Sequence, residues 1–161
     1  MIVIGYQGIG KSTLSLSETG TEIPFIDLES GCFWNDGVRA DDWYKSYVNV
    51  ALDLARQGHN VFVSSHKQVR EELLKSFRND IYVCYPSKKL KQSWIVKLRD
   101  RYTFSIEEER VKNYKAMMNA IDRYDENIDE LANSGFPCVE IDSMDYCLGD
   151  LLRQAEQTET L

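Results

Sequence analysis

The chain has 161 residues, of which 43% are hydrophobic and 28% are charged, and its formal net charge is −7. This length fits one domain with a substantial core and leaves little room for a second. The negative charge argues against a broad nucleic-acid-binding surface, although a local basic groove for phosphates is compatible with it. The four cysteines form no C-x-x-C pair, so we expect free, mostly buried thiols and neither a zinc site nor disulfides.

A phosphate-binding motif lies close to the start of the chain. Residues 5–12 read GYQGIGKS and match the pattern G-x-x-x-x-G-K-S/T. An apolar run at 2–4 precedes the motif and a helix-compatible sequence follows it, which is the strand-to-helix context that the pattern requires. The pattern predicts that Lys11 reaches the β and γ phosphates of a nucleoside triphosphate and that Ser12 binds Mg²⁺. The residues expected to contact the nucleotide are Gly8, Ile9, Gly10, Lys11, Ser12 and Thr13.

The rest of the chain alternates between short apolar runs and amphipathic stretches. Besides the strand at 2–4, the predicted strands are 24–29, 61–65, 81–85 and 137–142. The predicted helices are 41–57, 69–77, 87–102, 105–135 and 146–154. Strands that alternate with helices through right-handed crossovers predict an α/β fold, a three-layer sandwich with a five-stranded parallel sheet.

The segment 105–135 predicts the longest helix. Ser105 and Glu108 have the S-x-x-E spacing of a capping box, and Gly135 marks the end of the helix. The apolar residues expected to face inward are Val111, Tyr114, Met118, Ile121, Tyr124, Ile128 and Leu131. The stretch ahead of this helix is strongly basic. We assign residues 87–133 to a lid and a long helix within a single domain that covers 1–161.

Two classes of nucleotide-hydrolysing protein are disfavoured by the sequence. A regulatory GTPase needs an N-K-x-D string and a D-x-x-G string, and the chain has neither. A motor ATPase usually has an acidic pair at the end of a strand beside the phosphate loop. The strand at 61–65 instead ends in Ser64 and Ser65, and His66 follows it. A small phosphotransferase is the class that these patterns favour.

Over nearly its whole length the chain resembles the small P-loop kinases, a group that includes adenylate, shikimate and gluconate kinases. Gly-Lys-Ser-Thr at 10–13 is common in that group. The PFIDLE segment at 24–29 resembles the P-F-x-D-x-D segment of shikimate-type kinases, with Glu29 in place of the second aspartate. Residues 64–73 resemble the segment after the third strand of gluconate-type kinases. The Tyr-Pro pair at 85–86 with the basic stretch after it is also similar to small kinase-like proteins of bacteriophages.

The resemblance implies an ATP- and Mg²⁺-dependent kinase of the P-loop NTPase type. Its acceptor would be a nucleoside, a nucleotide or a DNA base. Ser12 and Asp27 would hold the metal, and Arg99 or Arg101 would close over the phosphates as a lid. The catalytic residues expected on this basis are Lys11, Asp27, Arg99 and Arg101. The alternative is a P-loop ATPase or an ATP-binding switch that acts through a protein or DNA partner.

Several of these side chains have a second interpretation. Asp27 could instead cap the turn after its strand, and the two arginines could belong to a solvated basic face. Glu29, His66 and Arg70 each have a structural alternative to substrate contact, and the sequence leaves these alternatives open.

The remaining expectations concern a base-binding wall, location and oligomeric state. Trp34 and Trp43 could form a wall that stacks a base, although packing in the core is the stronger alternative for Trp43. Because the first strand begins at residue 2, we expect no targeting segment ahead of it. No apolar stretch is long enough to cross a bilayer, which predicts a cytoplasmic protein without membrane contact. We expect a monomer or a weak dimer.

Overall fold

The sheet is the framework of the molecule. The computed structural model describes residues 1–16, 25–33 and 38–159. Their strands are β1 (Ile2–Gly5), β2 (Phe25–Asp27), β3 (Asn60–Ser64), β4 (Ile81–Pro86) and β5 (Cys138–Ile141). The strands form one sheet in the order β2-β3-β1-β4-β5, and each neighbouring pair is parallel. The predicted α/β class and five-stranded parallel sheet are therefore confirmed.

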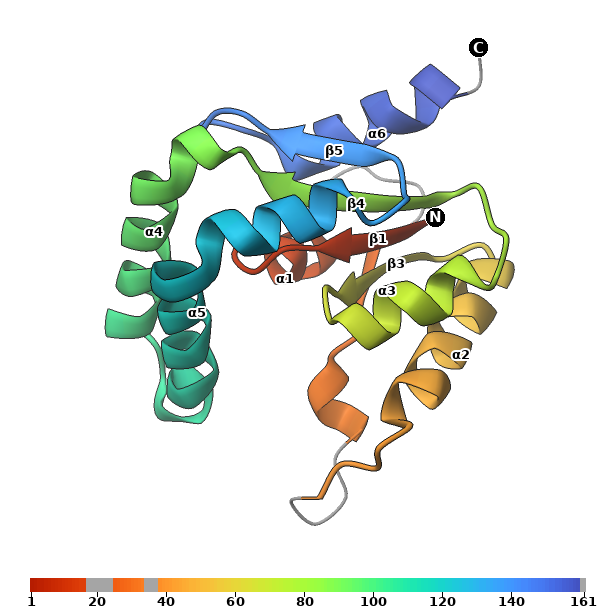
Figure 1. The fold of residues 1–161 in the computed structure, drawn as a ribbon, viewed down its shortest axis with the longest axis horizontal. Helices are drawn as coiled ribbons and strands as arrows, with labels where there is room; N and C mark the ends of the chain where they lie inside the picture. Colours follow the sequence, from red (N-terminus) through yellow and green to blue (C-terminus); the bar gives the residue numbers. More distant parts are fainter. Residues whose placement is uncertain (17–24, 34–37, 160–161) are drawn as a thin grey trace.

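Helices cover the two faces of this sheet. They are α1 (Lys11–Leu16), α2 (Trp43–Arg56), α3 (Lys67–Leu74), α4 (Lys91–Thr103), α5 (Glu107–Ala132) and α6 (Leu148–Glu159), with 3-10 turns at η1 (Ser30–Phe33) and η2 (Lys88–Leu90). Figure 1 shows α3 and the C-terminal half of α5 in front of the sheet, and α1 and α6 behind it. This arrangement is compatible with the predicted three-layer sandwich.

The central strand β1 determines where the functional loop begins. Ile2, Val3 and Ile4 are each 0% exposed, as expected for a strand that is covered on both faces. Along this strand, Ile4 is paired with Val63 of β3 on one side and with Val83 of β4 on the other. The chain leaves β1 toward β2 on one side and later returns to β4 on the opposite side. Such a reversal opens a crevice at the carboxyl ends of the strands, where ligands bind in α/β sheets.

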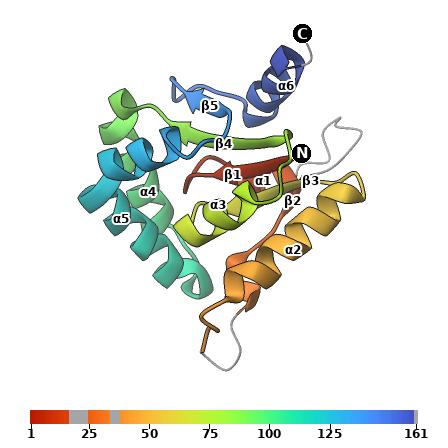
Figure 2. The same cartoon turned by 45° about the vertical axis from the view of Figure 1, so that its right-hand side comes forward.

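The helices α4 and α5 form a hairpin that projects beyond these carboxyl ends (Figure 1), and the rotated view in Figure 2 shows the two helices side by side. Backbone angles at Arg123 (φ −136°, ψ 22°) are not helical and kink α5. After the kink, the helix buries Tyr124, Ile128 and Leu131, as predicted. Before it, the predicted inward stripe is wrong. The exposed members of that stripe are Val111, Tyr114 and Ile121.

Two further local expectations are corrected. The capping box is absent because the hydroxyl of Ser105 donates to the carbonyl of Tyr102 at 2.7 Å, across the tight turn between α4 and α5. Ile106 is the N-cap residue instead, and it makes no side-chain capping bond. The cysteines are free as expected, but only Cys84 is buried, and the other three are exposed. No helix among the described residues combines the length and apolar character needed to span a membrane.

Candidate functional site

Residues 5–12, called the glycine loop below, connect β1 to α1. Gly8 (φ +84°) and Gly10 (φ +98°) have left-handed backbone angles that favour glycine. A Cβ atom at Gly8 would lie 3.0 Å from Cδ2 of Leu98, whereas a Cβ atom at Gly10 would meet nothing within 4 Å. The loop is thus packed tightly against α4 at Gly8 and open at Gly10.

Hydrogen bonds from three parts of the chain fix the glycine loop. The indole of Trp94 in α4 donates to the carbonyl of Gln7 at 3.0 Å, and the Gln7 amide donates to the carbonyl of Ala116 in α5 at 2.8 Å. The hydroxyl of Tyr146 donates to the carbonyl of Ile9 at 2.9 Å. None of these three bonds uses a backbone amide of the loop, although the amide of Tyr6 donates to the carbonyl of Cys84 at 2.9 Å.

Lys11 and Ser12 stand at the start of α1, next to the end of β2. The Lys11 ammonium donates to the carbonyl of Gly5 at a long 3.4 Å. Burial lowers the pKa of Lys11, and the nearby carboxylates of Asp27 and Glu29 counteract this in part. The Ser12 hydroxyl donates to Oδ2 of Asp27 at 2.8 Å. The sequence predicts that Ser12 and Asp27 lie close together, and the 2.8 Å distance between Oγ of Ser12 and Oδ2 of Asp27 shows that they do.

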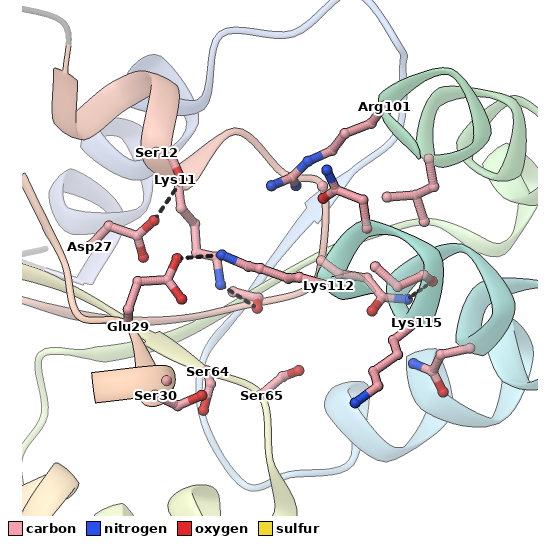
Figure 3. A pocket seen from close by; sticks show the side chains of 18 of the residues that line it. Lys11, Ser12, Asp27, Glu29, Ser30, Ser64, Ser65, Arg101, Lys112 and Lys115 are labelled. Carbon is pink, nitrogen blue, oxygen red and sulfur yellow. Dashed lines mark hydrogen bonds and ion pairs between the residues drawn. The ribbon is translucent and has the colours of Figure 1, made fainter. Parts of the chain in front are cut away.

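The glycine loop forms one wall of a cavity of about 990 Å³. The carboxylates that line the cavity belong to Asp27, Glu29 and Glu108, and the cations belong to Lys11, Arg39, Lys97, Arg101, Lys112 and Lys115. Figure 3 shows that the labelled side chains converge from opposite sides, with Lys112 and Lys115 coming from α5. Ligand pockets typically have volumes of about 300–1,000 Å³, so this cavity can hold more than a single small ligand.

Lys112 and Glu29 form an ion pair across the cavity, with 2.6 Å between Nζ and Oε1 (Figure 3). The two side chains are 52% and 45% exposed, so water screens the pair and its contribution to stability is small. An anionic ligand can therefore draw Lys112 away at little cost. Among the described residues, Arg101 and Lys115 line the cavity without any hydrogen bond or ion pair to the protein.

The wall opposite α5 comes from the end of β3. The His66 ring nitrogen Nδ1 and the Ser64 hydroxyl are 2.8 Å apart. Burial lowers the pKa of His66, and the positive charges of Arg39 and Lys11 lower it further. The imidazole is consequently neutral at pH 7. His66 thus makes the local hydrogen bond that was one of its two interpretations, and it also lines the cavity, while substrate contact stays a prediction.

Trp43 offers no open stacking face for the predicted tryptophan wall. Trp43 is only 8% exposed, and its ring packs edge-on against His66. The guanidinium carbon of Arg39 lies 3.3 Å from the centroid of the Trp43 ring and covers it. Packing in the core is therefore the correct interpretation for Trp43, while Trp34 lies outside the described residues.

The cavity brings together most of the site residues predicted from the sequence. Those that line it are Gly8, Gly10, Lys11, Ser12, Thr13, Asp27 and Arg101. The side chain of Ile9 is 1% exposed and packs in the core, so only the backbone of Ile9 is left for contact with a ligand. Arg99 does not line the cavity, and its side chain is 61% exposed. Arg70 is also outside it, because its guanidinium is bound by Glu130 at 3.0 Å and by the Ser65 carbonyl at 3.2 Å.

The sequence reasoning missed the contribution of α5 to the cavity. Lys112, Asn113, Lys115 and Asn119 all line it. Their spacing of three and four residues was the available signal, because Lys112, Lys115 and Asn119 lie on one helical face. The apolar residues of α5 predict a different inward face.

A metal would have few protein ligands in this cavity. The Ser12 hydroxyl and the Asp27 carboxylate offer hard oxygen atoms of the kind that Mg²⁺ prefers. No group of three or more His, Cys, Asp or Glu residues in the described part of the chain is arranged to hold an ion. Ser12 and Asp27 still fit Mg²⁺, which usually keeps waters and shares phosphate oxygens with few protein ligands.

Comparison with protein-family models and with curated proteins finds no match to the chain.

Proposed function

We propose that the protein is a phosphotransferase of the P-loop kinase type, which transfers the γ-phosphate of ATP to a small acceptor. The observation that carries the proposal is the arrangement around one cavity. A glycine loop with a lysine and a serine lies on one side, and two cations without protein partners among the described residues, Arg101 and Lys115, lie on the other. A triphosphate and an acceptor need both sides.

The glycine loop suits the donor triphosphate. Its left-handed glycines and its position before α1 are typical of loops whose backbone amides bind an anion. The pKa of Lys11, lowered by burial, would return toward its ordinary value when a phosphate group lies beside the ammonium. Ser12 and Asp27 would hold Mg²⁺, which supplies charge neutralisation at the β and γ phosphates.

The remaining residues suit the transfer step. An oxygen of the acceptor attacks the γ phosphorus, the bond from phosphorus to the bridging oxygen breaks, and ADP leaves. If that oxygen is a hydroxyl, its proton can pass to the carboxylate of Asp27 or to the neutral imidazole of His66, both of which line the cavity. Arg101 would stabilise the negative charge of the transferred group and help to keep water out.

ADP formation measured with and without acceptors tests the proposal. Purified protein with ATP and Mg²⁺ is given nucleosides, nucleotides, sugars and single- or double-stranded DNA in separate reactions. Turnover that depends on one acceptor class supports a kinase. Slow hydrolysis that no acceptor changes contradicts the proposal and supports an ATPase or an ATP-binding switch.

A further inference from the structure

A buried amide without a partner lies in the wall of the cavity. Asn113 is 2% exposed, and neither its Nδ2 nor its Oδ1 atom makes a hydrogen bond within the described parts of the chain. The same residue lines the cavity. Leaving a buried polar group unsatisfied is costly, and native proteins seldom do so without a reason. The geometry indicates that a bound molecule completes the hydrogen bonds of Asn113.

The backbone around Asn113 is held firmly against the glycine loop. Ala116, one turn further along α5, accepts the amide of Gln7 at 2.8 Å. On the neighbouring helix, Leu98 packs against Gly8, and Arg101 follows Leu98 by one turn toward the cavity. Asn113 therefore sits on a rigid part of the site, where a carboxamide can select a ligand by its hydrogen-bonding pattern.

The chemistry of a carboxamide narrows the class of ligand. It offers two N–H donors and one carbonyl acceptor side by side. Phosphate oxygens at neutral pH only accept hydrogen bonds, so a phosphate alone would leave Oδ1 without a donor. A nucleobase edge has a donor next to an acceptor and matches the carboxamide with two bonds, as Asn matches adenine. Sugar hydroxyls can also donate and accept, but a base edge fixes its donor and acceptor in one plane as the carboxamide does, and an ionised carboxylate only accepts.

A cation for the phosphate of the same ligand lies nearby on α5. Lys115 lines the cavity and forms no ion pair or hydrogen bond with any described residue. In Figure 3 its side chain extends toward the side of the cavity where Ser65 lies. The Ser64 and Ser65 hydroxyls line that side and can also donate to phosphate oxygens. The α5 wall therefore offers an amide that can pair with a base and a cation that can bind a phosphate, and both line the cavity.

We propose that Asn113 is a specificity-determining residue that pairs with the base of the acceptor, and that the acceptor is consequently a nucleotide whose phosphate is bound by Lys115. This inference rests on the proposed function, since it assigns the second half of the same cavity. Of the acceptors that the resemblance allows, the inference favours a nucleotide, and it disfavours sugars and acids that carry no base.

Calorimetric titration tests the inference without relying on turnover. A non-hydrolysable ATP analogue with Mg²⁺ is bound first, and the four nucleoside 5′-monophosphates, ribose 5-phosphate and inorganic phosphate are then titrated separately. At least one monophosphate is expected to bind about tenfold or more tightly than ribose 5-phosphate. Asn113→Ala should raise the Kd for that monophosphate about 10- to 100-fold. It should leave the affinities for ribose 5-phosphate and for the ATP analogue unchanged.

Two additional variants and a control complete the design. Lys115→Ala should weaken the binding of the monophosphate and of ribose 5-phosphate alike, because both ligands carry a phosphate group. Asn113→Leu removes both unpartnered polar atoms at similar volume, so it should keep or raise the Tm while it loses base preference. Asn49→Ala, on the exposed face of α2 and outside the cavity, should change none of these affinities.

Each other result overturns the inference. If the analogue binds but no base is preferred over ribose 5-phosphate, or if Asn113→Ala changes nothing, the inference fails and the proposed function stands. The inference also fails if Asn113→Ala weakens only the ATP analogue, because the amide then belongs to the donor. If the wild-type protein does not bind the analogue at all, the proposed function fails, and the inference fails with it.

Discussion

Replacement of Lys11 by methionine separates the two roles of this side chain. The long stem of Lys11 packs beneath the glycine loop, because a Cβ atom at Gly5 would lie only 2.8 Å from its Cδ. Methionine keeps an unbranched stem of similar length and removes the charge. Burial holds the pKa of Lys11 below its ordinary value of 10.5, so the ligand-free fold carries an unfavourable charge at neutral pH. We expect Lys11→Met to keep the stability of the ligand-free protein or to raise it by about 1 kcal/mol.

The pH dependence of stability follows from the same shift. Between the lowered folded pKa and 10.5, the unfolded chain binds more protons at Lys11 than the folded chain does. Stability of the wild type therefore gains a contribution as pH rises through this interval. Lys11→Met should lack that contribution.

The effect of ATP should be the opposite. At an ATP concentration about 100 times its Kd, binding stabilises the folded state by about 2.7 kcal/mol. For a chain of this size that is a rise in Tm of about 5–10 °C. The wild type should show this rise with ATP and Mg²⁺, and Lys11→Met should show less than about 1 °C. Thermal unfolding followed by tryptophan fluorescence measures both proteins.

A matched control is Lys45→Met, which removes an exposed lysine of α2 that does not line the cavity. It should keep the full response to ATP. The reasoning is refuted if Lys11→Met keeps the ATP-dependent rise in Tm, because the glycine loop would then bind no triphosphate through Lys11. A strongly lowered Tm of the ligand-free Lys11→Met protein would refute the argument about its buried charge.

Three further predictions concern the loop, the lid and the end of β3. Gly8→Ala should destabilise the protein by about 2 kcal/mol, seen as a lower Tm, because the left-handed backbone disfavours a Cβ atom and Leu98 crowds it; an unchanged Tm would contradict this. Arg101→Ala should lower kcat/KM about 100-fold, whereas Arg99→Ala should lower it less than about twofold, and equal effects would show that the cavity lining is misassigned. Burial lowers the pKa of His66 below 6.5, so the unfolded chain takes up a proton at this residue before the folded chain does, and the stability of the wild type should fall as pH drops below 6.5. Chemical denaturation at several pH values measures this fall, which should be smaller in His66→Gln.

The sequence was sufficient to predict the sheet and the side of the cavity that the glycine loop forms. Apolar runs with turn residues between them identified all five strands, because buried parallel strands have that composition. The proximity of Ser12 to Asp27 was expected from the resemblance together with the strand order of a parallel sheet. Asp27 is the last residue of β2, and Ser12 follows the glycine loop that leaves the carboxyl end of β1. The carboxyl ends of parallel strands meet at the same edge of the sheet.

The choice between Arg99 and Arg101 depended on the rotation of α4. Trp94 and Leu98 are buried and fix that rotation. Arg101 follows Leu98 by three residues and lines the cavity with Lys97, four residues before it. Arg99 follows Leu98 by one residue, which is about 100° around the helix, and it faces solvent. Helical spacing would have separated the two arginines once the buried face of α4 was known.

The α5 side of the cavity was harder to predict from the sequence. A regular apolar stripe assumes a straight helix, but Arg123 breaks the helix in the middle, so the stripe that holds for Tyr124 and Ile128 does not continue toward the N-terminus. Hydrophobic periodicity also passes over a buried asparagine. Asn113 is buried, whereas Val111 and Tyr114, which the predicted stripe placed inward, are exposed.

The central claim is that phosphate leaves a donor on the glycine loop for an acceptor in the same cavity. The most direct measurement follows the label from ATP carrying ³²P at the γ position, with Mg²⁺ and a mixture of nucleotides, in wild-type protein and in Asp27→Asn. Our account predicts that the label moves to one nucleotide in step with ADP formation, and that Asp27→Asn slows this transfer. Label that appears only as inorganic phosphate, at a rate unaffected by the nucleotides, would contradict it.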